Sequence, residues 1–232
     1  MITKPQLIAL DADDTLWANQ PHFDQAEADL KAFLAQYGTP TELDEALRQV
    51  QIENLPLLGY GAKGFTLSMI EVAIKLTEGQ VTGAAIQQII DQGKKLLRFP
   101  IELLDGVEEV LDALTPQYSL MLLTKGDLLD QESKLARSGI GAYFSHVEIV
   151  SEKNEAAYQK ILDRYGLQPA EFLMIGNSLK SDILPVAALG GQAIYIPYHT
   201  TWHIEQVTPP DTGIQYLQLD SLRDCLPLLL SE

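Results

Sequence analysis

Short apolar runs alternate with amphipathic helical segments along much of the chain, and this alternation constrains the fold more than any other feature. Six apolar runs predict strands at residues 6–11, 118–123, 147–150, 172–175, 192–196 and 217–219. From residue 106 onward, helical segments separate these runs. Strands that alternate with helices form parallel sheets whose crossovers are helical. We therefore expect an α/β fold.

A block with helical spacing alone separates the first predicted strand from the alternating region. Apolar residues recur there three and four positions apart and predict four helices. Thr41 with Asp44 resembles a helix start, and Gly93 weakens the fourth helix. The chain thus divides into an α/β core and a helical domain inserted into it, with predicted boundaries at residues 1–18 and 100–232 for the core and 19–99 for the insertion.

Composition and charge narrow the classes of partner. Hydrophobic residues make up 46% of the chain, which is enough for a substantial core. The 32 acidic residues exceed the 16 Lys and Arg residues, and the net charge of −16 repels nucleic acid and anionic membranes. Cys225 is the only cysteine, so no intrachain disulfide forms. The first apolar run is too short for a signal peptide or membrane span, and we expect a cytoplasmic protein.

Two acidic residues stand where the first predicted strand ends. Asp11 and Asp13 are two positions apart, so in extended chain their carboxylates point the same way, with backbones about 6–7 Å apart. In open α/β sheets, ligands bind beyond the carboxyl ends of the strands. A divalent cation would relieve the repulsion between the two carboxylates, and oxygen-only ligands suit Mg²⁺. A solvated acidic turn is the alternative for this segment alone.

The ends of the other predicted strands add the remaining parts of a phosphoryl-transfer site. They carry a hydroxyl, a flexible backbone N–H, two ammonium groups and further oxygen ligands, from Thr124, Lys125, Gly126, Lys153, Asn177 and Asp182. Because these strand ends meet at one edge of a parallel sheet, we expect their side chains to lie close together.

Four segments resemble the motifs of the haloacid dehalogenase superfamily. The first is LIALDADDTLW, similar to an apolar strand followed by Asp-x-Asp-x-Thr-Leu. LMLLTKGD resembles the second motif, Lys153 in VSEKNEAAYQKIL the third, and FLMIGNSLKSDILPVAALGG the fourth. The resemblance covers residues 6–17 and 106–200, and it implies a three-layer Rossmann-like sheet with an inserted all-helical cap domain.

The resemblance also implies an activity, which is Mg²⁺-dependent release of phosphate from a small phosphorylated metabolite. Asp11 would attack phosphorus, and Asp13 would act as the general acid and base. The metal would be held by the Asp11 side chain, the Asp13 backbone carbonyl, Asn177 and Asp182. The phosphoryl oxygens would be bound by Thr124, Lys125, Gly126 and Lys153. We expect a monomer or homodimer that binds neither nucleic acid nor membrane.

Substrate selection by a protein of this kind is expected in the cap. The segment GYGAKG at residues 59–64 follows a helical stripe rather than a strand, so it does not fit a nucleotide-binding fingerprint. It is better explained as a connector between cap helices. Tyr60 and Lys63 are its candidate substrate contacts.

Three positions depart from the family pattern. Asp14 stands where the family commonly has Gly, Lys125 where Asn is frequent, and Asn177 where an Asp commonly binds the metal. An amide oxygen can still coordinate Mg²⁺ but brings no negative charge, so Asp182 would carry more of the metal binding.

Three alternatives to a phosphatase remain open for a chain that resembles this superfamily. A 2-haloacid dehalogenase of the same superfamily would lack the second acid, which is present here as Asp13. A phosphomutase would share the whole motif set. A non-catalytic binding or regulatory protein on this fold would have no need of the acidic and basic residues at the strand ends.

Overall fold

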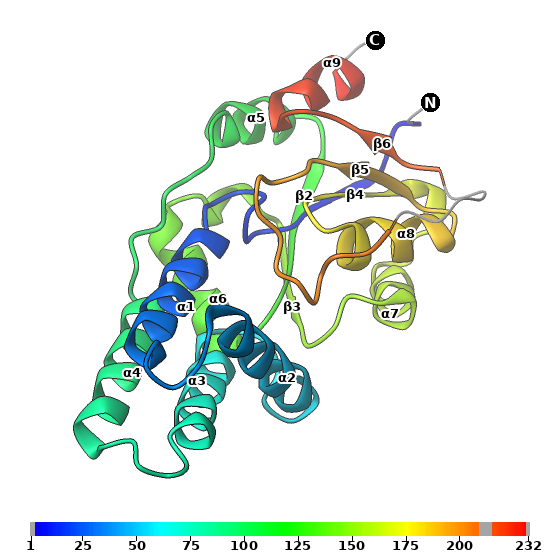
Figure 1. Cartoon of the computed structure of the whole chain (residues 1–232). Coiled ribbons are helices and arrows are strands. Elements are labelled where there is room, and N and C mark those ends of the chain that lie inside the picture. The colour runs from blue at the N-terminus through cyan, green and yellow to red at the C-terminus, as the bar shows by residue number, and fades with distance from the viewer. Residues whose placement is uncertain (1–2, 209–214, 231–232) are drawn as a thin grey trace. The chain divides into compact units, whose positions relative to one another are not determined.

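Figure 1 shows the computed structural model of the chain, in which residues 3–208 and 215–230 are described. Six strands form one sheet in the order β3-β2-β1-β4-β5-β6, and each pair of neighbours is parallel. The strands are β1 (Leu7–Leu10), β2 (Ser119–Lys125), β3 (His146–Val150), β4 (Phe172–Gly176), β5 (Gln192–Tyr195) and β6 (Leu217–Gln218). The predicted parallel α/β fold is confirmed.

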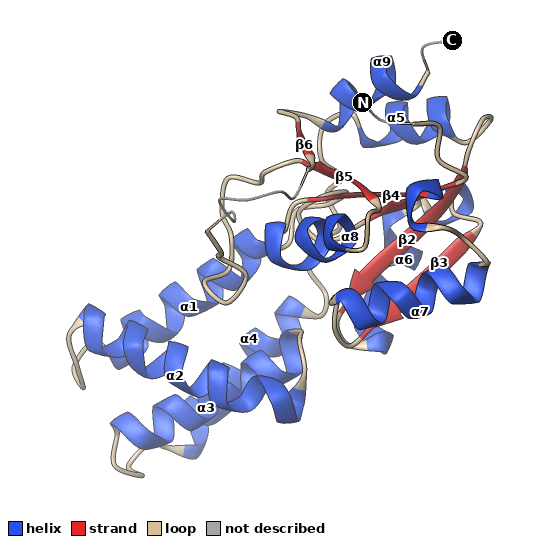
Figure 2. Ribbon diagram, turned by 90° about the vertical axis from the view of Figure 1, so that its right-hand side faces the viewer, coloured by secondary structure: helices blue, strands red, loops and turns tan. Residues whose placement is uncertain are grey.

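Helices cover both faces of the sheet and make the three layers of a Rossmann-like fold (Figure 2). Side chains alternate along β1, so that Ile8 and Leu10 enter one apolar cluster, while Leu7 and Ala9 enter the other. The first cluster includes residues of α5, α6 and α9, and the second includes residues of α7 and α8. These helices are α5 (Val107–Leu114), α6 (Leu128–Ser138), α7 (Glu155–Tyr165), α8 (Leu184–Ala188) and α9 (Leu226–Leu229).

The register of the central strands fixes where the polar strand ends come together. Leu10 of β1 pairs with Leu122 of β2 and with Ile175 of β4. The Asp11 N–H continues the pairing by donating to the Ile175 carbonyl at 2.9 Å. All four side chains of β1 are buried, because the strand is paired on both edges and covered on both faces. Asp11 therefore leaves the sheet at its centre.

Residues Pro21–Pro100 form a second compact unit, and the first comprises the segments up to Gln20 and from Ile101 onward. The second unit has its own apolar core, which includes Leu30, Leu47 and Met69. Within residues 3–208 and 215–230, no helix is both long and apolar enough to cross a membrane. The helices of this unit are α1 (Gln20–Leu34), α2 (Pro40–Leu58), α3 (Ala62–Leu76) and α4 (Gly83–Leu96).

The start of α2 lies two residues before the predicted position. Thr39, not Thr41, is the capping residue, and its hydroxyl accepts a hydrogen bond from the Glu42 N–H at 3.4 Å. The Glu42 carboxylate accepts in return from the Thr39 N–H at 2.7 Å. Pro40 occupies the first helical turn, where its missing N–H costs nothing. The reciprocal pair satisfies two backbone donors, which the predicted pair of Thr41 and Asp44 does not do.

Gly93 does not end the fourth helix, although a glycine weakens a helix interior. A Cβ atom at Gly93 would lie 2.0 Å from Oγ1 of Thr66, so no larger residue fits without a shift of Thr66. Glycine at this position therefore lets α3 and α4 pack closely, and tertiary packing compensates for its poor helix propensity.

Candidate active site

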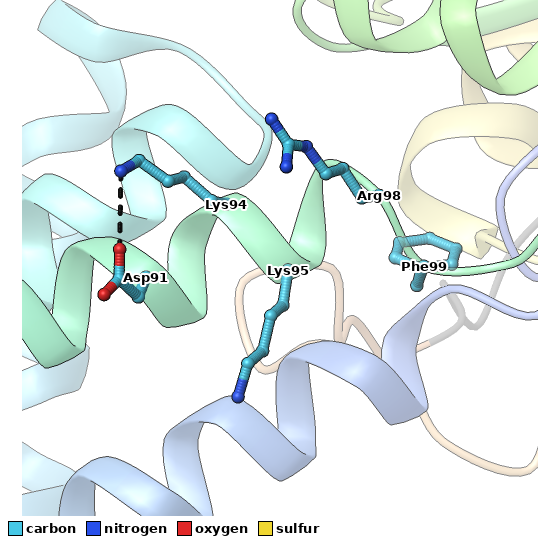
Figure 3. Close-up of a pocket in the computed structure, with 5 residues that line it drawn as sticks. All are labelled: Asp91, Lys94, Lys95, Arg98 and Phe99. Atoms are coloured by element: carbon cyan, nitrogen blue, oxygen red, sulfur yellow. Dashed lines mark hydrogen bonds and ion pairs between the residues drawn. The ribbon is translucent and has the colours of Figure 1, made fainter.

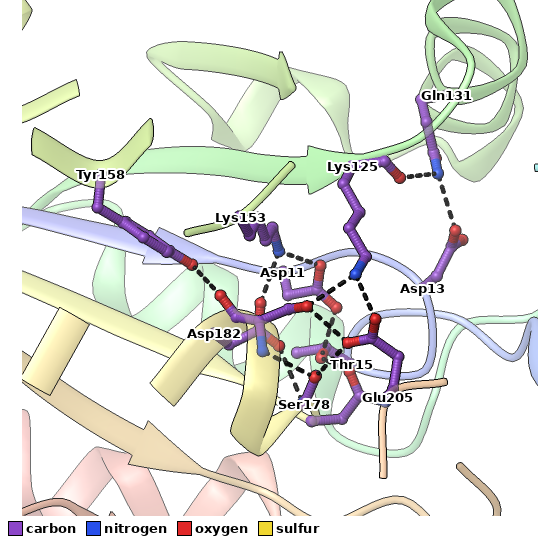
Figure 4. Close-up of polar contacts among 12 residues, drawn as sticks. Asp11, Asp13, Thr15, Lys125, Gln131, Lys153, Tyr158, Ser178, Asp182 and Glu205 are labelled. Carbon is purple, nitrogen blue, oxygen red and sulfur yellow. Dashed lines mark hydrogen bonds and ion pairs between the residues drawn. The ribbon is translucent and has the colours of Figure 1, made fainter. Parts of the chain in front are cut away.

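Three charged side chains from three strand ends meet at the centre of the sheet edge (Figure 4). Nζ of Lys153 lies 2.5 Å from Oδ1 of Asp11 and 2.7 Å from Oδ1 of Asp182. The three residues are 4%, 7% and 1% exposed, in that order, so water screens their charges poorly. The structure thus brings together the polar ends of the first, third and fourth predicted motifs.

Burial and charge together perturb the ionisation of this cluster. Burial, followed by the nearby Asp182 carboxylate, raises the pKa of Asp11 to about 7, and Lys153 opposes that rise. For Lys153, burial acts to lower the pKa, but Asp11 and Asp182 outweigh it and leave the pKa above its usual value. Lys153 is therefore an ammonium group that neutralises only one of its two carboxylate neighbours.

A π-helical turn at Leu179–Ile183 positions Asp182. Oδ2 of Asp182 accepts a hydrogen bond from the Ser178 N–H at 2.9 Å. Tyr158 Oη, buried on α7, donates to the Ser181 carbonyl at 2.9 Å and supports the turn from the other side. At Gly176, a Cβ atom would lie 2.3 Å from Oδ2 of Asp182, so this glycine gives the carboxylate its space. The wide turn directs Asp182 toward Lys153.

Oxygen atoms of Asp11 and Asn177 lie around one hydroxyl group. Oγ1 of Thr15 is 3.1 Å from Oδ2 of Asp11 and 3.3 Å from Oδ1 of Asn177. In the part of the chain that the structure describes, no three His, Cys, Asp or Glu side chains form a metal-binding group by themselves. Mg²⁺ uses one or two carboxylates with neutral oxygens and water, so two carboxylates, an amide oxygen and an excess negative charge fit this ion.

In the second motif, Lys125 and the Gly126 N–H already have hydrogen-bond partners within the protein. Thr124 is 1% exposed at the end of β2, and the Gly126 N–H donates to the Val150 carbonyl at 3.2 Å. Gly126 has a φ of +144°, a conformation that favours glycine. Nζ of Lys125 lies 2.7 Å from Oγ of Ser181. The structure places the Lys125 ammonium beside the turn of the fourth motif.

Glu205, which no motif predicts, is the ion-pair partner of Lys125. It lies beyond β5 in the segment 196–208, and Oε1 is 2.5 Å from Nζ of Lys125. Its Oε2 accepts hydrogen bonds from Ser178 at 2.7 Å and Ser181 at 2.5 Å. Burial acts to raise the pKa of Glu205, but the Lys125 charge and these hydrogen bonds outweigh it and lower the pKa. The acidic residue sits in an irregular segment without periodicity, so the sequence gives no signal for it.

The Asp13 side chain points toward α6 (Figure 4). Its carboxylate accepts hydrogen bonds from the indole of Trp17, the amide of Gln131 and the ammonium of Lys134. Lys134 and Gln131 were not among the residues predicted from the motifs. Both residues lie on a polar face of α6. The periodicity of the sequence predicts that such a face is exposed to solvent, but in the structure it is buried.

Asp14 occupies a position with an unusual backbone conformation. Its φ is +63°, a left-handed conformation that Asp tolerates better than most residues. Oδ1 of Asp14 accepts hydrogen bonds from the N–H groups of Asn19 at 2.8 Å and Gln20 at 3.0 Å. Burial raises the pKa of Asp14 to about 7, although these hydrogen bonds oppose the rise. Asp14 thus stabilises the backbone that follows the first motif.

The predicted substrate contacts Tyr60 and Lys63 belong to the helical unit. Tyr60 lies in the connection between α2 and α3, and Lys63 lies in the first turn of α3. Gly59 and Gly61 both have positive φ, so the segment is a connector between helices, as predicted. The substrate-binding role of the two residues stays a prediction.

A pocket of about 460 Å³ lies at the end of α4 in the same unit. Its lining combines one acidic, one aromatic and three basic residues (Figure 3), namely Asp91, Lys94, Lys95, Arg98 and Phe99. Nζ of Lys94 is 3.3 Å from Oδ1 of Asp91. All three basic residues are exposed, and cations at the C-terminal end of a helix are favoured by its dipole. Helix stabilisation is therefore a sufficient explanation for this group.

The chain resembles known proteins over most of its length. The family model for haloacid dehalogenase-like hydrolases matches residues 5–190. A crystal structure of a haloacid dehalogenase-like family hydrolase from Xanthomonas campestris is 38% identical, with a TM-score of 0.86, and the match covers 99% of this chain and 94% of that one. The family model spans the ends of β1, β2, β3 and β4, the strands that Asp11, Thr124, Lys153 and Asp182 end or follow.

Two of the curated relatives, one named a nucleotidase and one a phosphatase, match over shorter stretches. The pyrimidine 5'-nucleotidase PynA of Streptococcus pneumoniae is 32% identical over 130 residues, which cover 53% of this chain and 54% of that protein. The N-acylneuraminate-9-phosphatase of Mus musculus is 31% identical over 86 residues, which cover 35% of each chain. The family model and the Xanthomonas structure extend much further, and on their match this chain belongs to the haloacid dehalogenase-like hydrolase family.

Proposed function

We propose that the protein is a phosphatase that hydrolyses a small phosphomonoester through a phosphorylated Asp11. The observation that carries this proposal is the buried contact of Lys153 with both Asp11 and Asp182, because a nucleophilic carboxylate needs positive charge beside it to approach a phosphate. The names of the two curated relatives support the same reaction class.

The reaction has two steps with balanced proton transfers. Asp11 attacks phosphorus, the bond to the leaving oxygen breaks, and Asp13 gives that oxygen its proton. A water molecule then attacks the phosphorus of the aspartyl-phosphate while Asp13 takes one of its protons. The bond between phosphorus and Asp11 breaks, and inorganic phosphate leaves. Asp13 begins the cycle as the carboxylic acid and ends it in that form, and Asp11 ends it as the carboxylate.

The side chains around Asp11 would share the recognition of the transferred group. Lys153 would hold a phosphoryl oxygen while it neutralises charge on Asp11. Thr124, near the end of the neighbouring strand, would bind a further oxygen. The Gly126 N–H would bind one by exchanging its hydrogen bond to the Val150 carbonyl. Lys125 would contribute positive charge at the edge of the site, with its ammonium held by Glu205.

Magnesium fits the oxygen ligands of this site. We propose that Asp11, Asn177 and Asp182 hold the ion together with the Asp13 backbone carbonyl. When bound, Mg²⁺ supplies positive charge that offsets the repulsion between phosphate and the carboxylates. Asn177 is a neutral ligand. Among the proposed ligands from the fourth motif, Asp182 alone is a carboxylate, so it would supply the negative charge that this motif contributes to metal binding.

The helical unit Pro21–Pro100 is proposed to act as a cap that selects the substrate. Its insertion between the first and second motifs is the sequence position at which such caps occur in the family. Tyr60 and Lys63 are the proposed contacts. A phosphorylated metabolite with a polar organic part is the substrate class that an aromatic ring and an ammonium would recognise.

The proposal is tested by phosphate release from a panel of phosphomonoesters with and without Mg²⁺. We expect the wild-type protein to release phosphate in the presence of Mg²⁺. A chelator and the substitution Asp11→Asn should each abolish this release. Release of halide from 2-chloropropionate would instead identify a dehalogenase, and transfer of phosphate within a sugar without its release would identify a mutase. Phosphate release that survives Asp11→Asn would exclude the covalent mechanism.

A further inference from the structure

Three donors from two segments fix the carboxylate of Asp13. Nζ of Lys134 lies 2.9 Å from Oδ1 and 3.0 Å from Oδ2. Nε1 of Trp17 donates to Oδ1 at 2.7 Å, and Nε2 of Gln131 donates to Oδ2 at 2.8 Å. A carboxylate with donors on both oxygens has one preferred orientation, because any rotation breaks at least one bond.

Lys134 is itself held in place. Its ammonium also donates to Oδ1 of Asn19 at 2.8 Å and lies 4.0 Å from Asp130. The residue is only 2% exposed. A buried lysine loses hydration, and this cost is offset only where its donors have partners. The side chain therefore has little freedom, and it can act as a rigid support.

The helix that carries Lys134 exposes two leucines and buries several polar side chains, although its Leu135 packs against the apolar core. Leu128 and Leu129 are 59% and 67% exposed, while Asp130, Gln131 and Lys134 are buried. Burying polar groups in place of two leucines opposes stability. Core packing alone does not explain this arrangement, and the two buried donors on this face, Gln131 and Lys134, share Asp13 as a partner.

The side-chain amide of Gln131 is also oriented toward Asp13. Its Nε2 donates both to Asp13 and to the Lys125 carbonyl, at 3.1 Å in the second case. Its Oε1 has no hydrogen-bond partner among the described residues although it is buried. The orientation of the amide serves Asp13 at the cost of one unsatisfied oxygen.

We infer that Lys134 is a positioning residue that holds the Asp13 carboxylate in the orientation it needs for proton transfer, with Gln131 and Trp17 as its auxiliaries. The inference rests on the proposed function, in which Asp13 is the general acid and base. Lys134 acts through Asp13 and does not touch the substrate. Its removal would lower the fraction of enzyme in which Asp13 is correctly directed.

The test is a double-mutant cycle with two kinds of substrate. We expect Lys134→Met to lower kcat about 10- to 100-fold on an alkyl phosphate, whose leaving group needs a proton, with KM unchanged. The loss on p-nitrophenyl phosphate, whose leaving group is a weak base, should be several times smaller. In the background of Asp13→Asn, Lys134→Met should cause no further loss, since the residue it acts through is already absent.

Arg137→Met, on the exposed side of the same helix, is the matched control and should leave both activities unchanged. Thermal unfolding checks that each variant is folded, and Lys134→Gln replaces Lys134→Met in the cycle if the latter does not fold. Equal losses on the two substrates, or losses that add to those of Asp13→Asn, would overturn the inference. A wild-type protein that releases no phosphate from any phosphomonoester refutes the proposed function itself, and the inference with it.

Discussion

Lys153 places its ammonium 2.5 Å from the Asp11 carboxylate, although 142 positions separate the two residues along the chain. The sheet order explains the contact. Asp11 follows the central strand β1, and Lys153 follows the edge strand β3, with β2 between them. A long side chain from the start of α7 spans that distance and reaches the acidic cluster.

Lys153→Met should abolish phosphate release and lower the free energy of unfolding. It leaves Asp11 and Asp182 buried without their shared counter-charge, and breaking a buried ion pair costs about 3 kcal/mol of unfolding free energy. Urea unfolding at neutral pH measures this loss. Lys160→Met, on the exposed face of α7, the helix that follows Lys153, is the control and should change stability by less than about 0.5 kcal/mol. A Lys153→Met protein as stable and active as the wild type would contradict the account of the site.

Gly93→Ala should destabilise the helical unit, although alanine is the better helix former. The new methyl group would lie 2.0 Å from Oγ1 of Thr66, and overpacking of this kind costs about 1–3 kcal/mol. In the same helix, Gly83→Ala meets no atom within 4 Å and should be neutral or stabilising. Thermal unfolding of the two variants separates packing from propensity. Equal stability of the two would show that α3 and α4 do not need the glycine.

Glu205→Gln should weaken the fold in a pH-dependent way. The folded-state pKa of Glu205 lies below its usual value of 4.5. The carboxylate therefore stabilises the fold above pH 4.5, and this contribution is lost as the pH falls through the folded-state pKa. We expect the variant to lose about 2 kcal/mol at pH 7, with a difference that shrinks in acid.

Unfolding curves of wild type and variant across this pH range measure the difference. Glu45→Gln changes an exposed carboxylate in α2 and serves as the control, with an expected change below about 0.5 kcal/mol. A stability loss for Glu205→Gln that stays constant into acid would show that the ion pair with Lys125 is not its source.

The strands could be predicted from the sequence because they depend on local patterns, and the charged cluster follows from the topology that those strands imply. Apolar runs mark the strands, and the parallel topology then brings Asp11, Lys153 and Asp182 to one edge. The π-helical turn before α8 could not be predicted, since it depends on Tyr158 and on the space at Gly176. These contacts join segments that are distant in sequence.

The supports of the site were missed for a related reason. Lys134 and Gln131 lie on a helix whose polar residues suggest a solvated face, and only the fold shows that this face is buried. Glu205 stands in an irregular segment after β5. Periodicity predicts which residues are apolar and inside, but it cannot recognise a polar residue that is buried because it pairs with another charge.

The central claim is that Asp11 becomes phosphorylated, and acid quenching during turnover tests it most directly. Peptide mass analysis of the quenched enzyme should find one phosphoryl group on the peptide that contains Asp11, and hydroxylamine should remove it, because acyl phosphates react with this reagent. Asp11→Asn should carry no such group. Turnover without a phosphorylated Asp11 peptide, or a hydroxylamine-resistant phosphate elsewhere in the chain, would contradict the proposed mechanism.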